Sequence, residues 1–200
     1  MSDDRKGWRI SSARTIYDNP WLRLRSYKAA APTGKDCEYG LVSFKKLAVG
    51  VLPLFADGAT LLVGQHRFTT GRYSWELPEG GGEMTEPPLD TARRELAEET
   101  GYGAGAWSPL LADLHLSNSV TDERAFAYLA WDLVPNDEHA PDETESLNLR
   151  RLPVGEAVHM AVSGTITDAF TLAMLLKADH LWRTGQLPQE LADAFRAGQI

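Results

Sequence analysis

Cysteine is almost absent from this sequence. With one cysteine, Cys37, among 200 residues, the chain has neither an intrachain disulfide nor a cysteine-based zinc site. Long apolar runs are also lacking, because stretches such as 47–55 are far shorter than a membrane-spanning helix requires. The first residues are charged and lead into no apolar core, which argues against a signal peptide. We therefore expect a cytoplasmic protein that does not interact with a membrane.

Basic residues are fewer than acidic residues in this sequence. The chain has 20 Lys and Arg against 28 Asp and Glu, a formal net charge of −8. A long nucleic acid as the main partner is excluded, because binding its phosphate backbone requires a basic face. A small phosphorylated substrate remains compatible with this charge, since a bound cation reverses the local sign. The apolar fraction of 43% supplies a core for one medium domain, or for a domain with a smaller appendage.

The N-terminal part predicts a small antiparallel strand unit. Residues 21–27 alternate in polarity, residues 32–36 form a turn, and residues 38–44 continue as a strand. Trp21 and Leu22 are interpreted as core residues of this unit in preference to ligand contacts. Because so few strands rarely bury themselves alone, we divide the chain into an N-terminal strand unit, 1–46, and a main domain, 47–200.

The main domain mixes strands and helices without regular alternation, which predicts an α+β fold or a three-layer sandwich. Asp57-Gly58 between two apolar runs is a strong hairpin signal. A helix is expected over 88–100, with prolines at its start and Gly101 at its end. The remaining predicted elements are strands at 47–55, 60–65, 107–116, 124–134 and 147–152, and helices at 154–163, 168–182 and 188–197.

The helix over 88–100 has an acidic face. Glu95, Glu98 and Glu99 are spaced three and four residues apart, so their carboxylates share one side of the helix. Like charges at this spacing destabilise a helix by roughly 0.2–0.5 kcal/mol per pair, and a divalent cation such as Mg²⁺, Mn²⁺ or Ca²⁺ would offset that cost. The alternative is a solvated acidic surface with Arg93 and Arg94 as counter-charges.

The wider segment 80–102 resembles the Nudix box. It matches that pattern at Gly80, Glu86, Arg94, Glu95, Leu96, Glu98, Glu99, Gly101 and Tyr102. The resemblance implies a Nudix α/β/α sandwich in which the box forms a loop–helix–loop. It further implies that Glu95, Glu98 and Glu99, with the backbone carbonyl of Glu79, bind Mg²⁺, for which Mn²⁺ is a substitute. Arg94 would orient a neighbouring carboxylate, and we count Arg94 and Glu98 among the catalytic residues.

The chemistry expected at this segment is hydrolysis of a diphosphate. Attack by water requires that the phosphate charge be neutralised, the nucleophile activated and the leaving group stabilised, and bound divalent cations supply all three. Gly80 and Gly81 would bind the substrate, because glycine lets the backbone approach the phosphates closely.

Outside the box, the chain resembles the branch of the family that contains the ADP-ribose and nucleoside-diphosphate-sugar pyrophosphatases. The resemblance rests on the segments 19–22, 63–67, 75–78 and 167–170. It implies that the N-terminal strand unit forms a homodimer, with strand exchange as one route, and helps to build the substrate site. Arg67 would contact the substrate phosphates, which suits its fork geometry. Glu76 is interpreted as a partner of Arg67 or Arg72, or as a substrate contact.

The same branch implies a catalytic base from an acidic loop after the box. Here the corresponding stretch is 142–145, so Glu143 or Glu145 would polarise the attacking water. Glu145 is preferred because it adjoins the following strand. The alternative interpretation is that these residues are solvated loop charges.

One segment departs from the pattern of the ADP-ribose enzymes. They have a proline downstream of the box, whereas the chain has Asn118 at that place, within Leu-Ser-Asn-Ser-Val-Thr-Asp-Glu at 116–123. This favours a nucleoside diphosphate sugar over strict ADP-ribose specificity. Ser117 and Asn118 offer groups that could read a sugar or base, and Glu123 is a candidate for a substrate, metal or water contact.

Together these features predict a Mg²⁺-dependent hydrolase that converts a nucleoside diphosphate sugar or ADP-ribose to a nucleoside monophosphate and a sugar phosphate. One alternative is a Nudix enzyme acting on another nucleotide diphosphate, such as a dinucleoside polyphosphate. Another is a non-catalytic nucleotide-sugar sensor, which should have lost some of the metal carboxylates. The chain retains all of them.

Overall fold

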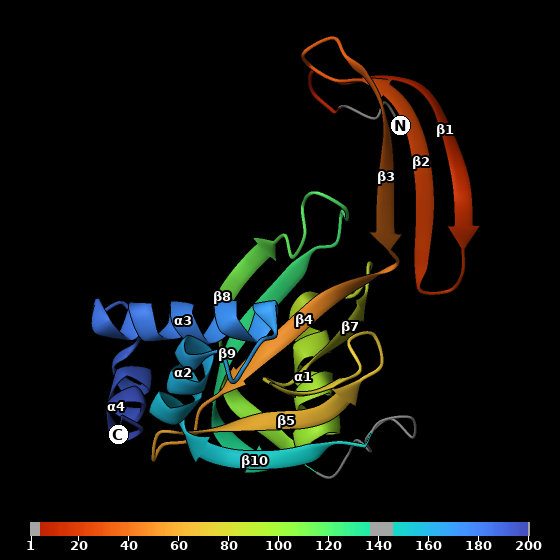
Figure 1. Ribbon diagram of the computed structural model, residues 1–200. Helices are drawn as coiled ribbons and strands as arrows, with labels where there is room; N and C mark the ends of the chain where they lie inside the picture. Colours follow the sequence, from red (N-terminus) through yellow and green to blue (C-terminus); the bar gives the residue numbers. More distant parts are fainter. Residues whose placement is uncertain (1–4, 137–145, 200) are drawn as a thin grey trace.

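The computed structural model describes residues 5–136 and 146–199 and combines three β-sheets with four described helices (Figure 1). This mixed architecture confirms the α+β prediction. No helix in the described ranges is long and apolar enough to cross a membrane.

The N-terminal strands form a sheet of their own. Strands β1 (Arg9–Asp18), β2 (Leu22–Ala30) and β3 (Asp36–Phe44) pair antiparallel in the order β1-β2-β3. The sheet projects away from the rest of the molecule (Figure 1). It contacts the main domain along β3, where the Val42 amide donates a hydrogen bond to the Val120 carbonyl at 2.9 Å and the Tyr39 hydroxyl donates one to the Ser119 carbonyl at 2.6 Å.

The central sheet has the order β7-β4-β9-β8, with β7 at Glu79–Glu83, β4 at Lys46–Pro53, β9 at Ala125–Pro135 and β8 at Tyr102–Leu114. Helix α1 (Pro88–Thr100) covers one face of this sheet, where its Ala92 and Leu96 pack against Val49 and Val51. The other face lies toward α3 (Ala169–Arg183), and an added Cβ at Gly50 would meet the Met174 sulfur at 2.8 Å. This three-layer arrangement is the sandwich that the sequence predicts.

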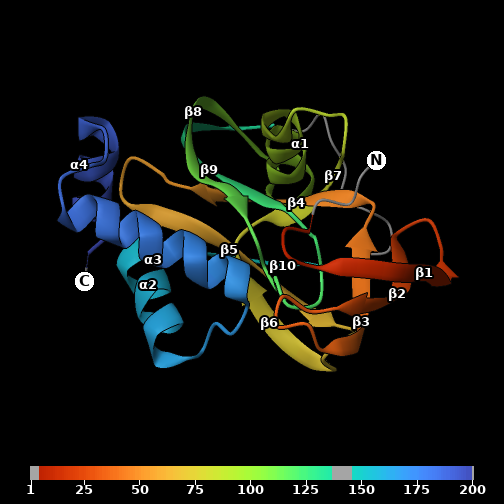
Figure 2. The same ribbon diagram turned by 90° about the horizontal axis from the view of Figure 1, so that it is seen from above.

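The third sheet contains β10 (Asn148–Pro153), β5 (Ala59–Arg67) and β6 (Arg72–Glu76) in that order. Helices α2 (Val154–Ser163) and α4 (Gln189–Ala197) lie with α3 at the C-terminal end of the molecule (Figure 2). The larger apolar core is shared by these helices and the sheets, and Phe195, Leu191 and Met174 are completely buried within it.

The predicted hairpin at Asp57-Gly58 is wrong. A turn is present, and Gly58 has a φ of +82°, but β4 pairs with β7 and β9 whereas β5 pairs with β10 and β6. Because both edges of β4 are occupied, the turn leads the chain into a different sheet. Gly58 packs closely on Gly198: a Cβ added at Gly58 would lie 2.0 Å from the backbone nitrogen of Gly198.

The helix predictions agree closely with the structure. Helix α1 spans the predicted residues, starts after Pro87 and ends at Gly101, which is left-handed with a φ of 70°. Helices α2, α3 and α4 lie within one residue of their predicted ranges. The sequence did not identify strand β7, since glycines at 80–82 suggest only a loop, and it missed β6 as well.

Candidate active site

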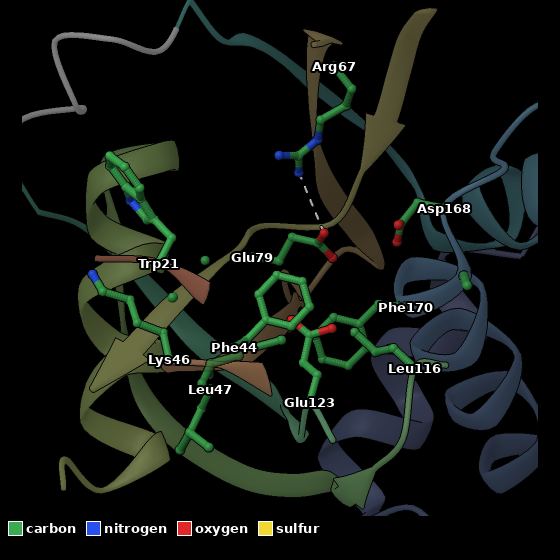
Figure 3. A pocket seen from close by; sticks show the side chains of 15 residues that line it. Trp21, Phe44, Lys46, Leu47, Arg67, Glu79, Leu116, Glu123, Asp168 and Phe170 are labelled. Carbon is green, nitrogen blue, oxygen red and sulfur yellow. Dashed lines mark ion pairs between the residues drawn. The ribbon is translucent and has the colours of Figure 1, made fainter. Parts of the chain in front are cut away.

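A cavity of about 450 Å³ lies where the N-terminal sheet, the central sheet and the start of α3 meet (Figure 3). Its polar side chains point inward from separate elements: Arg67 from β5, Glu79 from β7, Asp168 from the residue before α3, and Glu123 from the segment before β9. Apolar walls complete it. They are formed by Trp21, Phe44, Leu47, Ala48, Val49, Leu116, Ala169 and Phe170.

A smaller cavity of about 200 Å³ adjoins the first, between β7 and α1. It is lined by the acidic face of α1, namely Glu95, Glu98 and Glu99, together with Arg94. The two cavities share the lining residues Lys46, Glu79, Gly80 and Gly81. The acidic helix face is therefore not a solvated surface; it lines the small cavity, which adjoins the larger one.

Arg94 connects α1 to the glycine strand. Its guanidinium lies 2.9 Å from the Glu95 carboxylate and 2.7 Å from that of Glu98, and it donates a hydrogen bond of 3.0 Å to the Gly81 carbonyl. Glu99 accepts a hydrogen bond of 3.0 Å from the backbone amide of Glu79. Arg94 thus orients two carboxylates, and each side of the small cavity is tied to the other by polar contacts.

The glycines of β7 let the helix approach the strand. An added Cβ at Gly80 would lie 2.2 Å from the carboxyl carbon of Glu95, and one at Gly82 would lie 2.4 Å from the Thr91 hydroxyl. That hydroxyl in turn donates a hydrogen bond to Glu86 at 2.8 Å. These contacts explain the glycines at 80 and 82 by close packing, rather than by a tight turn.

The donor set fits a hard divalent cation. Carboxylate oxygens surround the small cavity, and one buried carboxylate oxygen of Glu79 has no hydrogen-bond partner in the described structure. In the described ranges, however, no three acidic, histidine or cysteine side chains already converge on one point. Arg94 and the Glu79 amide hold the acidic side chains of α1 in this arrangement.

Arg67 is fixed by Glu76. Its guanidinium Nε donates hydrogen bonds to both Glu76 oxygens, at 2.9 and 3.0 Å, and one terminal nitrogen also contacts Glu76. The other carboxylate near Arg67 is that of Glu79, at 3.5 Å. Of the alternatives for Glu76, the structure shows the partnership with Arg67, and a substrate contact stays a prediction.

Negative charge accumulates around Glu79. Burial raises the pKa of Glu79 well above its usual value, the carboxylates of Asp168 and Glu76 raise it further, and Arg67 lowers it. Asp168 also caps α3, because its side chain accepts a hydrogen bond from the Thr171 amide at 2.7 Å. Burial likewise raises the pKa of Glu123. Such a concentration of carboxylates is costly without a cation.

Comparison with known proteins identifies the fold that builds this site. The model of the NUDIX domain matches residues 44–170. This range includes the box, the residues of the main domain that line the two cavities, and the start of α3. The chain belongs to the Nudix family. The match extends beyond the nine box positions to the central sheet, the third sheet, α1 and α2, and it confirms the family resemblance seen in the sequence.

Individual relatives extend this similarity over most of the chain. An ADP-ribose pyrophosphatase from Mycobacterium tuberculosis is 33% identical over 87% of this chain and 84% of its own. A CMP-5'-(N-acetyl-N-hydroxy-3-aminopropyl)phosphonate hydrolase from Streptomyces rubellomurinus is 31% identical over 84% of this chain and 81% of its own. A solved structure titled as an ADP compounds hydrolase superposes with a TM-score of 0.79, covering 90% of this chain and 97% of that one at 22% identity, which shows the same fold.

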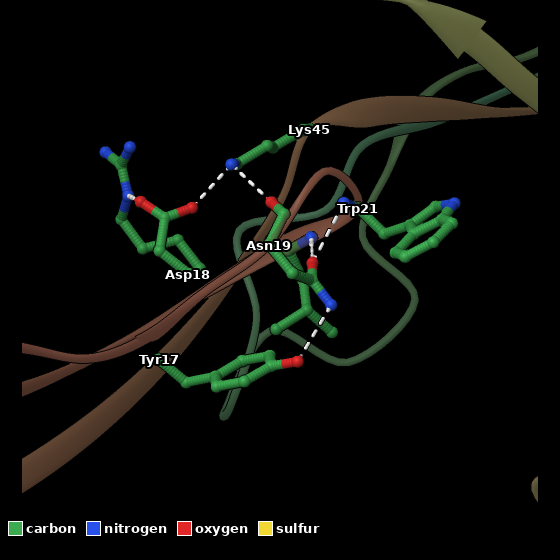
Figure 4. A network of polar contacts seen from close by, with 7 residues as sticks. Tyr17, Asp18, Asn19, Trp21 and Lys45 are labelled. Atoms are coloured by element: carbon green, nitrogen blue, oxygen red, sulfur yellow. Dashed lines mark hydrogen bonds and ion pairs between the residues drawn. The ribbon is translucent and has the colours of Figure 1, made fainter.

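Trp21 differs from the sequence-based interpretation. It is 66% exposed and lines the large cavity rather than a core. Its position follows from the turn between β1 and β2, where the Asn19 side chain accepts hydrogen bonds from the amides of Trp21 and Leu22 at 2.9 and 2.7 Å. Lys45 contacts Asp18 and the Asn19 carbonyl, which ties this turn to the end of β3 (Figure 4). No periodicity in the sequence indicates this placement, because the contacts are made across distant strands.

The segment 116–123 is divided between two cavities. Glu123 lines the large cavity, and its role as a substrate, metal or water contact stays a prediction. Asn118 instead lines a separate cavity of about 280 Å³ beside the N-terminal sheet. Ser117 lines neither, and its carbonyl accepts hydrogen bonds from the Val120 and Thr121 amides, each at 3.0 Å. Within one chain, Ser117 and Asn118 therefore do not reach the predicted substrate site. Glu143 and Glu145 lie outside the described residues.

Proposed function

We propose that this protein is a Mg²⁺-dependent hydrolase that cleaves the diphosphate of a nucleoside diphosphate sugar or ADP-ribose. The products would be a nucleoside monophosphate and a sugar phosphate. The observation that supports this most directly is the juxtaposition of the Nudix carboxylates on α1 with a cavity large enough for an organic group. Mn²⁺ is expected to substitute for Mg²⁺, because both prefer oxygen ligands.

The residues proposed to hold the metal are Glu95, Glu98 and Glu99, together with Glu79. Their oxygen atoms suit Mg²⁺, and the excess of acidic groups around Glu79 gives a reason for a cation to bind. When bound, divalent ions would neutralise the diphosphate and supply an activated water. Arg94 would set the orientation of Glu95 and Glu98, and the backbone of Gly80 and Gly81 would bind the phosphates beside β7.

Two roles in the reaction fall to side chains beyond the metal site. Arg67 would place the diphosphate, since its guanidinium lines the large cavity while Glu76 fixes its orientation. The general base is assigned to Glu145 or Glu143, with Glu145 preferred, and it would take the proton of the attacking water. This assignment rests on the family resemblance alone.

The substrate class is supported by the relatives. Proteins named ADP-ribose pyrophosphatase are 33% identical to this chain in both Mycobacterium tuberculosis and Bacillus subtilis. An ADP-sugar pyrophosphatase from Mus musculus is 32% identical over 46% of this chain. These names keep ADP-ribose beside the nucleoside diphosphate sugars, although the missing proline at Asn118 favours the sugars.

A homodimer formed through the N-terminal unit, 1–46, is part of the proposal, with 47–200 as the hydrolase domain. Strand β1 has almost every residue exposed, including the apolar side chains of Ile16 and Tyr17. A strand with an unpaired edge and exposed apolar groups favours association with a second copy. In a dimer, Ser117 and Asn118 would be candidates for contacts across the interface. A cytoplasmic location is likewise proposed, and cell fractionation would test it.

A substrate panel tests the function. The purified full-length protein is incubated with Mg²⁺ and ADP-ribose, several nucleoside diphosphate sugars, NADH or dinucleoside polyphosphates, and the phosphate released after phosphatase coupling is measured. We expect turnover to be fastest with the sugars or ADP-ribose and to be abolished by EDTA. Absence of turnover with the whole panel would refute the hydrolase assignment. Light scattering tests the dimer, which a monomer of about 22.1 kDa would contradict.

A further inference from the structure

Lys46 occupies the boundary between the two cavities. It is the first residue of β4 and lines both the large cavity and the small carboxylate cavity. In the β4–β7 register it lies opposite Glu83, while Ala48 and Gly50 lie opposite Gly81 and Glu79. Because alternate residues of a strand share a face, Lys46 shares its face with Glu79 rather than with Leu47 and Val49, which pack beneath α1.

Gly81 allows the Lys46 side chain to lie across β7. An added Cβ at Gly81 would be 3.0 Å from the Lys46 Cδ, tighter than most such contacts. The lysine stem therefore packs against bare backbone. Figure 3 shows Lys46 beside Trp21, on the opposite side of the cavity from Asp168. A molecule that extends from the Trp21 side of the large cavity to α1 would pass the ammonium group.

The other cations of the two cavities are already committed to carboxylates. Arg67 is held by Glu76, and Arg94 is held by Glu95 and Glu98. Among the described residues, Lys46 has one ion-pair partner, Glu83, at a distance of 3.6 Å. Both members of that pair are half exposed or more, so it contributes little stability. The charge of Lys46 is therefore more available to a ligand than that of either arginine.

The two cavities contain more acidic than basic side chains. The cavities are lined by six carboxylates, Glu79, Glu95, Glu98, Glu99, Glu123 and Asp168, against three cations, Lys46, Arg67 and Arg94. A further positive charge on the cavity wall would favour a diphosphate among these carboxylates. An ammonium on a flexible stem can meet a phosphate oxygen without precise geometry.

We propose that Lys46 binds a non-bridging phosphate oxygen of the substrate and so contributes, beside Arg67, to the recognition of the diphosphate. The inference rests on the proposed function only for the identity of the organic part of the substrate. The contact between Lys46 and a phosphate group does not depend on that identity. Lys46 would act in substrate binding, and the acid–base step would be left to other residues. Its loss should accordingly raise KM more than it lowers kcat.

The test compares Lys46→Met with wild type, with Lys46→Arg as the charge-retaining variant and Lys177→Met as the matched control on an exposed part of α3. Isothermal titration measures the dissociation constant of inorganic diphosphate in the presence of Mg²⁺. Lys46→Met should bind it about tenfold more weakly, equivalent to about 1.4 kcal/mol. Lys46→Arg should recover most of this affinity, and Lys177→Met should match wild type.

Two further measurements separate a phosphate contact from a structural role. The thermal midpoint of Lys46→Met should stay close to that of wild type, because the side chain is half exposed. The wild-type dissociation constant should rise with ionic strength more steeply than that of Lys46→Met. Binding of diphosphate within twofold of wild type by Lys46→Met, or no binding by wild type, would overturn the proposal. Failure of the substrate panel alone would instead refute the proposed function.

Discussion

The two walls of the active-site cavity are held in different ways. On the α1 side, Glu95 is 8% exposed, and its carboxyl carbon would lie 2.2 Å from a Cβ added at position 80 of β7. On the N-terminal side, Trp21 is 66% exposed, and the turn that presents it is held by surface hydrogen bonds and ion pairs. Close packing fixes atoms to fractions of an ångström, whereas exposed polar contacts permit adjustment. We therefore expect the chemistry to depend on the rigid wall and the substrate preference to depend on the adjustable one.

The largest expected effect is on the rigid wall. Glu99→Gln removes a carboxylate charge from the proposed metal site while retaining an acceptor for the Glu79 amide. We expect kcat to fall by about 10²–10³-fold, the scale seen when one transition-state contact is lost, with little change in the fold. Asp90→Asn, which removes an exposed carboxylate from the same helix, is the control. Steady-state kinetics and circular dichroism would measure both. Normal turnover by Glu99→Gln would contradict the ligand assignment.

A backbone change tests how rigid that wall is. Gly80→Ala places a methyl group 2.2 Å from the Glu95 carboxyl carbon, so either the strand or the carboxylate must move. Overpacking of this kind costs about 1–3 kcal/mol, and displacement of a supporting group typically lowers activity about 10–100-fold. The matched control is Gly40→Ala, where no atom lies within 4 Å of the new Cβ. Thermal unfolding and kcat are the measurements. If Gly80→Ala and Gly40→Ala behave alike, the packing argument fails.

The adjustable wall should respond differently. Trp21→Ala removes an exposed indole from the large cavity without opening a core. We expect KM to rise by about tenfold, equivalent to about 1.4 kcal/mol, while kcat and the thermal midpoint change little. Phe68→Ala, at a fully exposed aromatic residue outside the lining of this cavity, is the control. A fall in kcat comparable to that of Glu99→Gln would remove the distinction between the two walls.

The smallest effect concerns stability against pH. Burial raises the pKa of Glu123 in the folded protein, so the folded state holds its proton to higher pH than the unfolded state does. Wild type should therefore lose stability, relative to Glu123→Gln, as pH rises from the unfolded value near 4.5 through the folded pKa. At neutral pH Glu123→Gln should melt only a few degrees higher, because 1 kcal/mol corresponds to roughly 2–4 °C in a domain of this size. Thermal unfolding of both proteins across this pH range is the measurement. A melting point of Glu123→Gln below that of wild type at neutral pH would contradict the raised pKa of Glu123.

Prediction from sequence was most accurate where the determinants are local. The bounds of α1 follow from the prolines before it, the helical spacing of its apolar residues and Gly101 after it. The error at Asp57-Gly58 has the opposite cause. A turn signal is local, but whether two flanking strands pair depends on which partners occupy their edges, and here β7 and β9 occupy those of β4.

The same distinction applies to the residues of the site. Glu95, Glu98 and Glu99 are identified by their spacing because one helix presents all three on one face. Other residues of the site come together only in the folded chain, because they lie on strands, and at the beginning of a helix, that are distant in sequence. They are Arg67, Glu79, Glu123 and Asp168. For Glu76, the sequence left three interpretations, and the hydrogen bonds show that it is a partner of Arg67.

The sequence by itself determined the family and the acidic helix face, since both depend on residues close together along the chain. Only the tertiary structure decided that this face lines the small cavity and that Trp21 lines the large cavity instead of packing in a core. It also decided that Lys46 lies at the boundary between the two cavities. These are contacts between β4, β7, α1 and the β1–β2 turn. Their geometry is set by strand pairing and close packing of the folded chain, which no short stretch of sequence encodes.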